Sequence, residues 1–157
     1  MTYTTAFHEI CHLWVLIFHL EFNWGKAYVK DIGYGREMAT VKGFHPCLDD
    51  LEDLEDTAQY MVAGIAGEYL LGEFNDDDDI FDIFESEESY SQDFSIFSQA
   101  YDAAVSNHNQ EFSAEEWFDN AFNEVIAFLE STDRNALNDA ANYFLKHEDY
   151  EIKCDHQ

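Results

Sequence analysis

The sequence predicts a mostly helical α+β domain with about five helices and a small β-hairpin or sheet. Three observations favour this class. Apolar residues recur at helical spacing over several long segments, whereas residues 27–44 are rich in β-prone residues. The chain of 157 residues is also 46% hydrophobic, which is enough to fill one core. We therefore expect a single domain over residues 1–157.

The first two elements follow from capping residues and turn residues. Thr4 or Thr5 can cap a first helix that runs to about Leu20. Short β-prone runs between Ala27 and Phe44 then flank Gly33-Tyr34-Gly35, a combination typical of a hairpin.

The second helix is expected to be long and buried. Asp49 or Asp50 can cap it, and Gly72 can end it just after Leu71. Its apolar residues fall on one stripe: Leu51, Leu54, Ala58, Met61, Ile65 and Tyr69.

Residues 73–89 differ in composition from the rest, because acids dominate them, including the run from Asp76 to Asp79. We expect an acidic surface loop here, with a few docked aromatic side chains. The spacing of the acids does not match a calcium-binding EF-hand loop.

Three more helices are expected after this loop. Ser91 can cap the third, which extends to about Ser106. The sequence from Ser113 to Glu116 is a capping box that opens the fourth, which runs through Leu129. Thr132 or Asp133 can open the fifth.

The net charge of −27, from 34 acids against 7 Lys and Arg residues, restricts the partners. Repulsion from phosphates argues against nucleic acid and anionic membranes as partners. Because the acids are spread along the chain, a solvated surface is favoured, and a nucleic-acid mimic for a basic protein is the alternative.

The cysteines and the apolar segments indicate a soluble, cytoplasmic protein. Cys11, Cys47 and Cys154 are odd in number and form no CxxC pair, so we expect reduced thiols. No basic segment followed by an apolar one marks a signal peptide, and the apolar run from Ile10 to Phe22 is too short for a membrane span.

The first predicted helix carries the pattern HExxH, as His8-Glu9-Ile10-Cys11-His12. Histidines four residues apart on a helix share one face, so both can reach one metal ion. The pattern therefore predicts Zn²⁺ bound by His8 and His12, with Glu9 as the general base that activates water for hydrolysis.

A third protein ligand must come from elsewhere. The extended pattern HExxHxxGxxH is excluded, because Val15 replaces its glycine and Phe18 its last histidine. His19 lies about 10 Å along the helix from His12, too far to join the same site. Glu68, within an apolar stretch, and Asp93, on the first turn of the third helix, both remain candidates.

The order of these segments resembles the peptidase domain of the FtsH family, the ATP-dependent zinc metalloproteases. That family has an AxHEAGHA helix, a hairpin, a long helix ending near GGRAAE, a loop with an aspartate segment, and closing helices. The corresponding stretches here are AFHEICHL, the hairpin, AGIAGEYLLGE, SQDFSIFSQA, FDNAFNEVIAFL and NALNDAANYFLKHEDYE.

The resemblance implies a zincin-like fold and a zinc endopeptidase that cleaves unstructured polypeptide. It implies Asp93 as the third zinc ligand and gives Glu68 a supporting or structural role. It also implies that the strand from Met38 to Phe44 aligns a substrate peptide by strand addition.

The chain also departs from the family. It contains no P-loop (GxxxxGK followed by Ser or Thr), and its histidine motif begins at residue 8, so we expect neither an ATPase domain nor a membrane anchor in this chain. Ile10 replaces the alanine and Cys11 the glycine inside the motif, and Ile65 replaces the arginine of GGRAAE. These departures leave open a separate unfoldase as partner and a homo-oligomer. They also leave open an alternative function, that of a catalytically inactive zincin-fold binding or regulatory protein.

Overall fold

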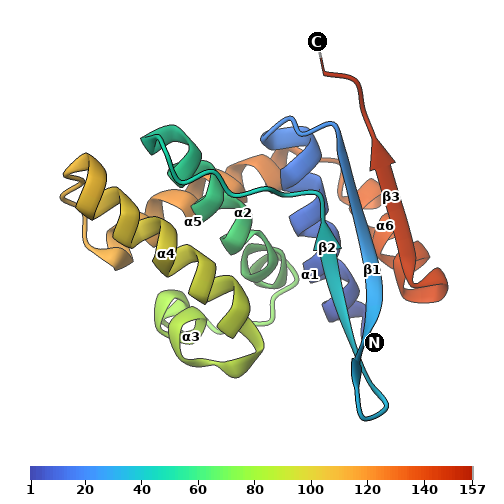
Figure 1. Ribbon diagram of the computed structural model, residues 1–157. Coiled ribbons are helices and arrows are strands. Elements are labelled where there is room, and N and C mark those ends of the chain that lie inside the picture. The colour runs from blue at the N-terminus through green and yellow to red at the C-terminus, as the bar shows by residue number, and fades with distance from the viewer. Residues whose placement is uncertain (157) are drawn as a thin grey trace.

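The computed structural model describes residues 1–156 and has a mostly helical α+β fold, as predicted. Within these residues there are six α-helices and one three-stranded antiparallel sheet (Figure 1). Gln157, the last residue of the predicted domain, lies outside the described part. The elements are α1 (Tyr3–Trp14), β1 (Trp24–Gly33), β2 (Arg36–Lys42), α2 (Leu51–Leu70), α3 (Ile80–Ser86), α4 (Ser91–His108), α5 (Ala114–Ser131), α6 (Arg134–His147) and β3 (Asp149–Lys153).

The helix ends agree closely with the capping residues of the sequence, with two exceptions. Asp50, Ser113 and Asp133 are the caps of α2, α5 and α6, and the capping box at Ser113 is complete. At α1, however, the hydroxyl of Thr2 accepts the backbone N–H of Thr5 at 3.1 Å, so the cap lies earlier than expected. Ser91 is the first residue of α4 rather than its cap.

The sheet has the order β2-β1-β3. The predicted hairpin is confirmed as β1 and β2, and β3 adds to the other side of β1, with Gly25 opposite Ile152. Strand β3 was not expected from the sequence. Its addition leaves β2 as the edge strand on the side of the sheet nearer α4 (Figure 1).

The expected acidic loop over residues 73–89 is wrong in part, because α3 lies within it. Asp79 caps this helix by accepting the N–H of Asp82 at 3.1 Å. Phe84 is fully buried, and its ring centroid lies 5.6 Å from that of Phe97. The docked aromatic side chains are therefore confirmed, while burial of the apolar side of the segment makes it helical.

Two glycines allow α2 to approach α1 closely. A Cβ atom on Gly67 would lie 2.6 Å from Sγ of Cys11, and a Cβ atom on Gly64 would overlap the imidazole of His8. Cys11 is fully buried in the core. The three cysteines form no disulfide, and no helix in residues 1–156 is both long and apolar enough to cross a bilayer.

Candidate metal centre

Helix α1 brings the two histidines of the motif together. His8 and His12 lie one turn apart on the same face, and their Nε2 atoms are 3.2 Å from each other. His12 is buried and His8 is half-buried. The helical placement expected from the four-residue spacing is therefore present.

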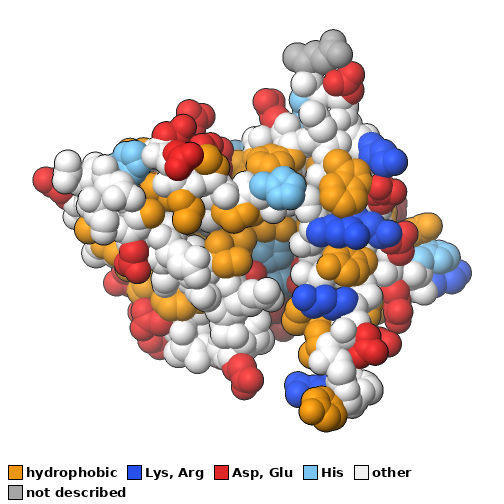
Figure 2. All heavy atoms as spheres, viewed as in Figure 1, with side chains coloured by type: hydrophobic (Ala, Val, Ile, Leu, Met, Phe, Trp, Pro, Cys, Tyr) orange, Lys and Arg blue, Asp and Glu red, His pale blue; other side chains and the backbone are white. Residues whose placement is uncertain are grey.

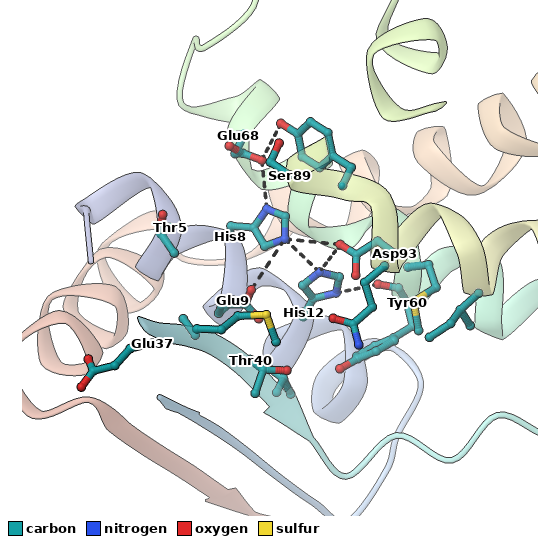
Figure 3. A pocket seen from close by; sticks show the side chains of 17 residues that line it. Thr5, His8, Glu9, His12, Glu37, Thr40, Tyr60, Glu68, Ser89 and Asp93 are labelled. Atoms are coloured by element: carbon teal, nitrogen blue, oxygen red, sulfur yellow. Dashed lines mark hydrogen bonds and ion pairs between the residues drawn. The ribbon is translucent and has the colours of Figure 1, made fainter. Parts of the chain in front are cut away.

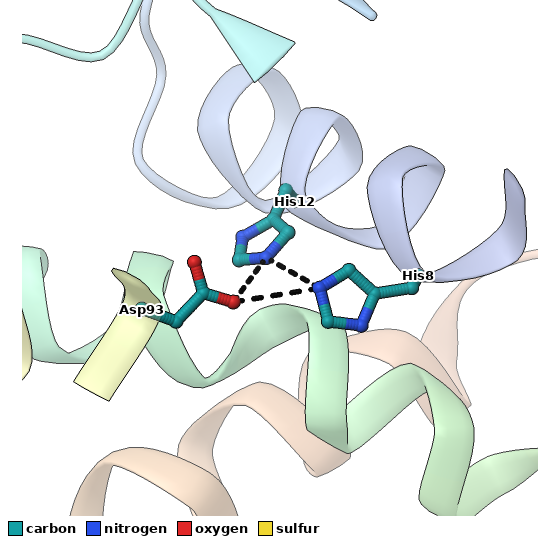
Figure 4. Close-up of side chains that lie close together, drawn as sticks. All are labelled: His8, His12 and Asp93. Carbon is teal, nitrogen blue, oxygen red and sulfur yellow. Dashed lines mark hydrogen bonds and ion pairs between the residues drawn. The ribbon is translucent and has the colours of Figure 1, made fainter. Parts of the chain in front are cut away.

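Asp93 on the first turn of α4 completes the group (Figure 4). Its Oδ2 atom is 3.1 Å from Nε2 of His12 and 3.4 Å from Nε2 of His8. Two ring nitrogens and one carboxylate oxygen thus converge on one small space. These three side chains could hold a metal ion.

The outer nitrogen of each ring is held by an oxygen atom. Nδ1 of His12 donates to the backbone carbonyl of Tyr60 at 2.8 Å, and Nδ1 of His8 donates to Oε2 of Glu68 at 2.9 Å. A carbonyl can only accept, so Nδ1 of His12 carries the proton, and a carboxylate favours the same tautomer in His8. In a neutral ring the Nε2 lone pair points toward the other ring and toward Asp93, whereas in a protonated ring Nε2 donates a hydrogen bond to Asp93.

Three electron-rich atoms this close together require positive charge among them. Burial opposes a charged imidazole, yet hydrogen bonds with Asp93 and Glu68 raise the pKa of His8 well above its ordinary value. Burial likewise opposes ionisation of Asp93, but attraction to His12 and hydrogen bonds from both rings hold its pKa well below its usual range. The group therefore favours positive charge at its centre, which either a proton or a metal ion could supply.

Glu68 does not belong to the converging group, although it was the alternative candidate for third ligand. Its Oε2 atom accepts from the outer nitrogen of His8 and also from the hydroxyl of Tyr90 at 2.8 Å. The ring of Tyr90 stacks beside that of His8, with centroids 6.1 Å apart. Glu68 thus orients His8, and Tyr90 orients Glu68.

We expect Glu68→Ala to weaken metal binding without removing the site. Outer carboxylates of this kind contribute about 10–100-fold to metal affinity, because they fix the ring and its tautomer. Competition with a chromogenic chelator would measure the change, with Glu130→Ala on the exposed side of α5 as the matched control. Complete loss of binding in Glu68→Ala would instead make Glu68 a ligand.

Glu9 lies beside the group without joining it (Figure 3). Its Oε1 atom is 3.8 Å from Nε2 of His8, and its side chain is 14% exposed. Burial raises the pKa of Glu9, while the two nearby histidines lower it and Asp93 and Glu68 raise it further. A half-buried carboxylate next to a cation site is suited to accept a proton.

The group and Glu9 line one cleft of about 390 Å³. Residues 37–41 of β2 form one wall of the cleft, and residues of α1, α2 and α4, with Ser89 and Tyr90 just before α4, form the rest. Figure 3 shows Thr40 on β2 below Glu9 and His12. The edge strand therefore runs past the candidate centre.

The remaining predictions concern residues outside the centre. Nε2 of His19 donates a hydrogen bond to Oε1 of Gln59 at 2.7 Å, and His19 is not in the converging group, as expected from its distance. Phe18 is 45% exposed and takes no part in the site.

Three contributions to the site were missed from the sequence: Gly64, the carbonyl of Tyr60 and the hydroxyl of Tyr90. For Gly64 there was a usable signal, because two glycines three residues apart in a helix indicate close approach of another element. A backbone carbonyl and a single tyrosine leave no such pattern.

No protein-family model, no curated protein sequence and no solved structure matches this chain. The similarity to the FtsH peptidase domain consequently depends only on the residues and segment order described above, and it stays a prediction.

Proposed function

We propose that this protein is a zinc-dependent metalloendopeptidase with His8, His12 and Asp93 as the zinc ligands. One observation carries the proposal: two Nε2 atoms and a carboxylate oxygen converge with separations of 3.1 to 3.4 Å. The Nδ1 atoms of both histidines are already hydrogen-bonded to oxygen atoms. The resemblance to the FtsH peptidase domain, with its zincin-like fold, supports the same assignment.

The donor set and its spacing both fit zinc. Ligand atoms at the corners of a tetrahedron with bonds of about 2.0–2.1 Å lie about 3.3–3.4 Å apart. The three measured separations are close to this spacing. Two imidazoles and one carboxylate are a common set for catalytic zinc, which keeps a fourth position for water or substrate.

Glu9 is the general base in this proposal. Zinc bound here would supply Lewis-acid polarisation of a peptide carbonyl and acidify a water molecule. The Glu9 carboxylate accepts the proton of the attacking water and passes it to the leaving amine. Glu68 and Tyr60 hold the two rings in place through their outer nitrogens.

The substrate class follows from the free edge of β2. Among the described residues β2 pairs only with β1, and residues 37–41 line the cleft. An extended peptide could pair with this edge through its backbone, which tolerates many sequences. The proposed substrate is therefore a flexible or unfolded polypeptide, delivered by a separate unfoldase where the target is folded.

The experiment is cleavage of an unstructured, fluorescence-quenched peptide by the purified protein. We expect cleavage that stops when a chelator removes the metal and returns when zinc is added. Cleavage that persists in the chelator would contradict the proposal. Zinc binding without any cleavage would favour the alternative, a zincin-fold binding or regulatory protein.

A further inference from the structure

The outer face of the sheet carries a concentration of positive charge that the proposed chemistry does not use. Five of the seven Lys and Arg residues of the chain lie in the three strands. Figure 2 shows basic and apolar side chains alternating along the sheet, beside the hollow that contains histidine. The five residues are Lys26, Lys30, Arg36, Lys42 and Lys153.

Strand geometry assigns most of these side chains to one face. Gly25 and Ala27 are buried, so the alternate residues of β1 project away from the core. Cross-strand partners share that face, and they include Lys42 opposite Lys26 and Lys153 opposite Trp24. We call this set the basic sheet face; it consists of Trp24, Lys26, Tyr28, Lys30, Lys42 and Lys153.

The acids on this face are already engaged. Asp149 pairs with Lys26 at 2.9 Å. Glu151 accepts the indole N–H of Trp24 at 2.5 Å and lies 3.8 Å from Nζ of Lys153. Within residues 1–156, Lys30 and Lys42 form no ion pair. Two lysines thus stay unpaired in a chain with 34 acids.

Lys26 and Lys42 are directly opposite each other on neighbouring strands. Asp149 offsets the charge of Lys26, whereas Lys42 has no carboxylate partner among the described residues. An anion bound at Lys42 would supply one. At physiological ionic strength charges are screened beyond about 8 Å, so the local positive field governs what binds here more than the distant acids do.

We propose that the basic sheet face binds an acidic segment of a polypeptide partner. Carboxylates of such a segment pair with Lys30 and with Lys42, which lies over the rings of Trp24 and Tyr28. Because the face adjoins β2, a bound segment holds the neighbouring stretch of its chain at the edge of the cleft. That last consequence depends on the proposed peptidase function, whereas the binding itself does not.

Two observations favour a peptide over a nucleic acid. Nζ of Lys42 lies 4.9 Å from the ring centroid of Tyr28 and 5.9 Å from that of Trp24, so the rings are not free for stacking bases. Nucleic acid also carries a negative charge on every nucleotide. A chain of net charge −27 therefore repels nucleic acid more strongly than it repels a peptide with a few acids.

The test uses the full chain with Glu9→Gln, so that no peptide is cleaved. A fluorescein-labelled, unstructured peptide with several glutamates is titrated and followed by fluorescence anisotropy at low and moderate salt. We expect saturable binding that weakens with salt and falls about two- to thirtyfold in Lys30→Gln/Lys42→Gln, since two exposed charged contacts are lost. Lys146→Gln on α6, which removes one positive charge elsewhere, should bind like the parent.

Trp24 reports where the peptide binds. Trp14 and Trp117 are buried, at 8% and 5% exposure, so Trp24 is the accessible tryptophan. Unlabelled acidic peptide should change its emission with the same affinity, and Trp24→Phe should abolish the change. Anisotropy without this emission change would place binding elsewhere and overturn the proposal.

Three further results would also overturn it. A peptide with glutamine at each glutamate position could bind equally well, or oligo-dT could bind more tightly than the acidic peptide. Alternatively, the peptide could fail to bind while the chain itself sediments as a dimer. If Lys30→Gln/Lys42→Gln dissociated that dimer, the partner would be a second copy of the chain. None of these results depends on peptide cleavage, so they are distinguishable from failure of the peptidase proposal.

Discussion

Glu9→Gln is expected to lower kcat/KM for peptide cleavage by about 10²–10⁴-fold, because the amide cannot accept a proton from water. Glutamine has nearly the same size as glutamate, so the packing of α1 should be retained. Glu9 is not among the three converging side chains, and zinc affinity should therefore be close to that of the parent. Initial rates with the quenched peptide, together with metal content, would measure both quantities.

The matched control for this variant is Glu130→Gln, the same substitution on the exposed side of α5. It should cleave at the rate of the parent. Full activity in Glu9→Gln would show that another group accepts the proton. Loss of zinc in Glu9→Gln would mean that Glu9 helps to hold the metal.

Gly64→Ala is expected to disrupt the metal centre although Gly64 touches no metal ion. A methyl group at this position would overlap the His8 ring, so either the ring turns away or the two helices move apart. Small movements of a ligand cost much affinity, because the three ligand atoms must stay within about 0.5 Å of their places. We expect a loss of zinc affinity of at least about 100-fold, together with about 1–3 kcal/mol of stability.

Gly67→Ala separates these two effects. Gly67 lies one turn further along α2, and a methyl group at this position would meet Sγ of Cys11 rather than a histidine. It should lower the free energy of unfolding in urea by a similar amount while zinc affinity stays near that of the parent. Equal zinc affinities in Gly64→Ala and Gly67→Ala would contradict the role assigned to Gly64.

The helices could be predicted because their limits are local. Capping side chains such as Asp50 and Ser113 lie next to the backbone groups that they satisfy, and apolar spacing marks the buried face. Helix α3 could not be predicted, because an apolar pattern over seven residues among many acids is too short to distinguish a helix from a solvated loop. Strand β3 was missed because its pairing with β1 joins residues more than a hundred positions apart, and short strands carry little local pattern.

The residues of the candidate site likewise fall into those that the local sequence predicts and those that it does not. The two histidines and Glu9 are visible in the sequence, since four-residue spacing on a helix places them together whatever the rest of the chain does. The physics of single residues left Asp93 and Glu68 equivalent, and only the resemblance favoured Asp93. The structure separates them by position, with Asp93 between the two Nε2 atoms and Glu68 on the outer nitrogen of His8.

The central claim is that His8, His12 and Asp93 bind one zinc ion. Native mass spectrometry of zinc-loaded, desalted protein tests it most directly, using the parent chain, His12→Ala, Asp93→Ala and Glu68→Ala. The account predicts one zinc ion per chain in the parent, none in His12→Ala or Asp93→Ala, and a weaker but detectable ion in Glu68→Ala. Zinc retained by Asp93→Ala, or no zinc in the parent, would contradict it.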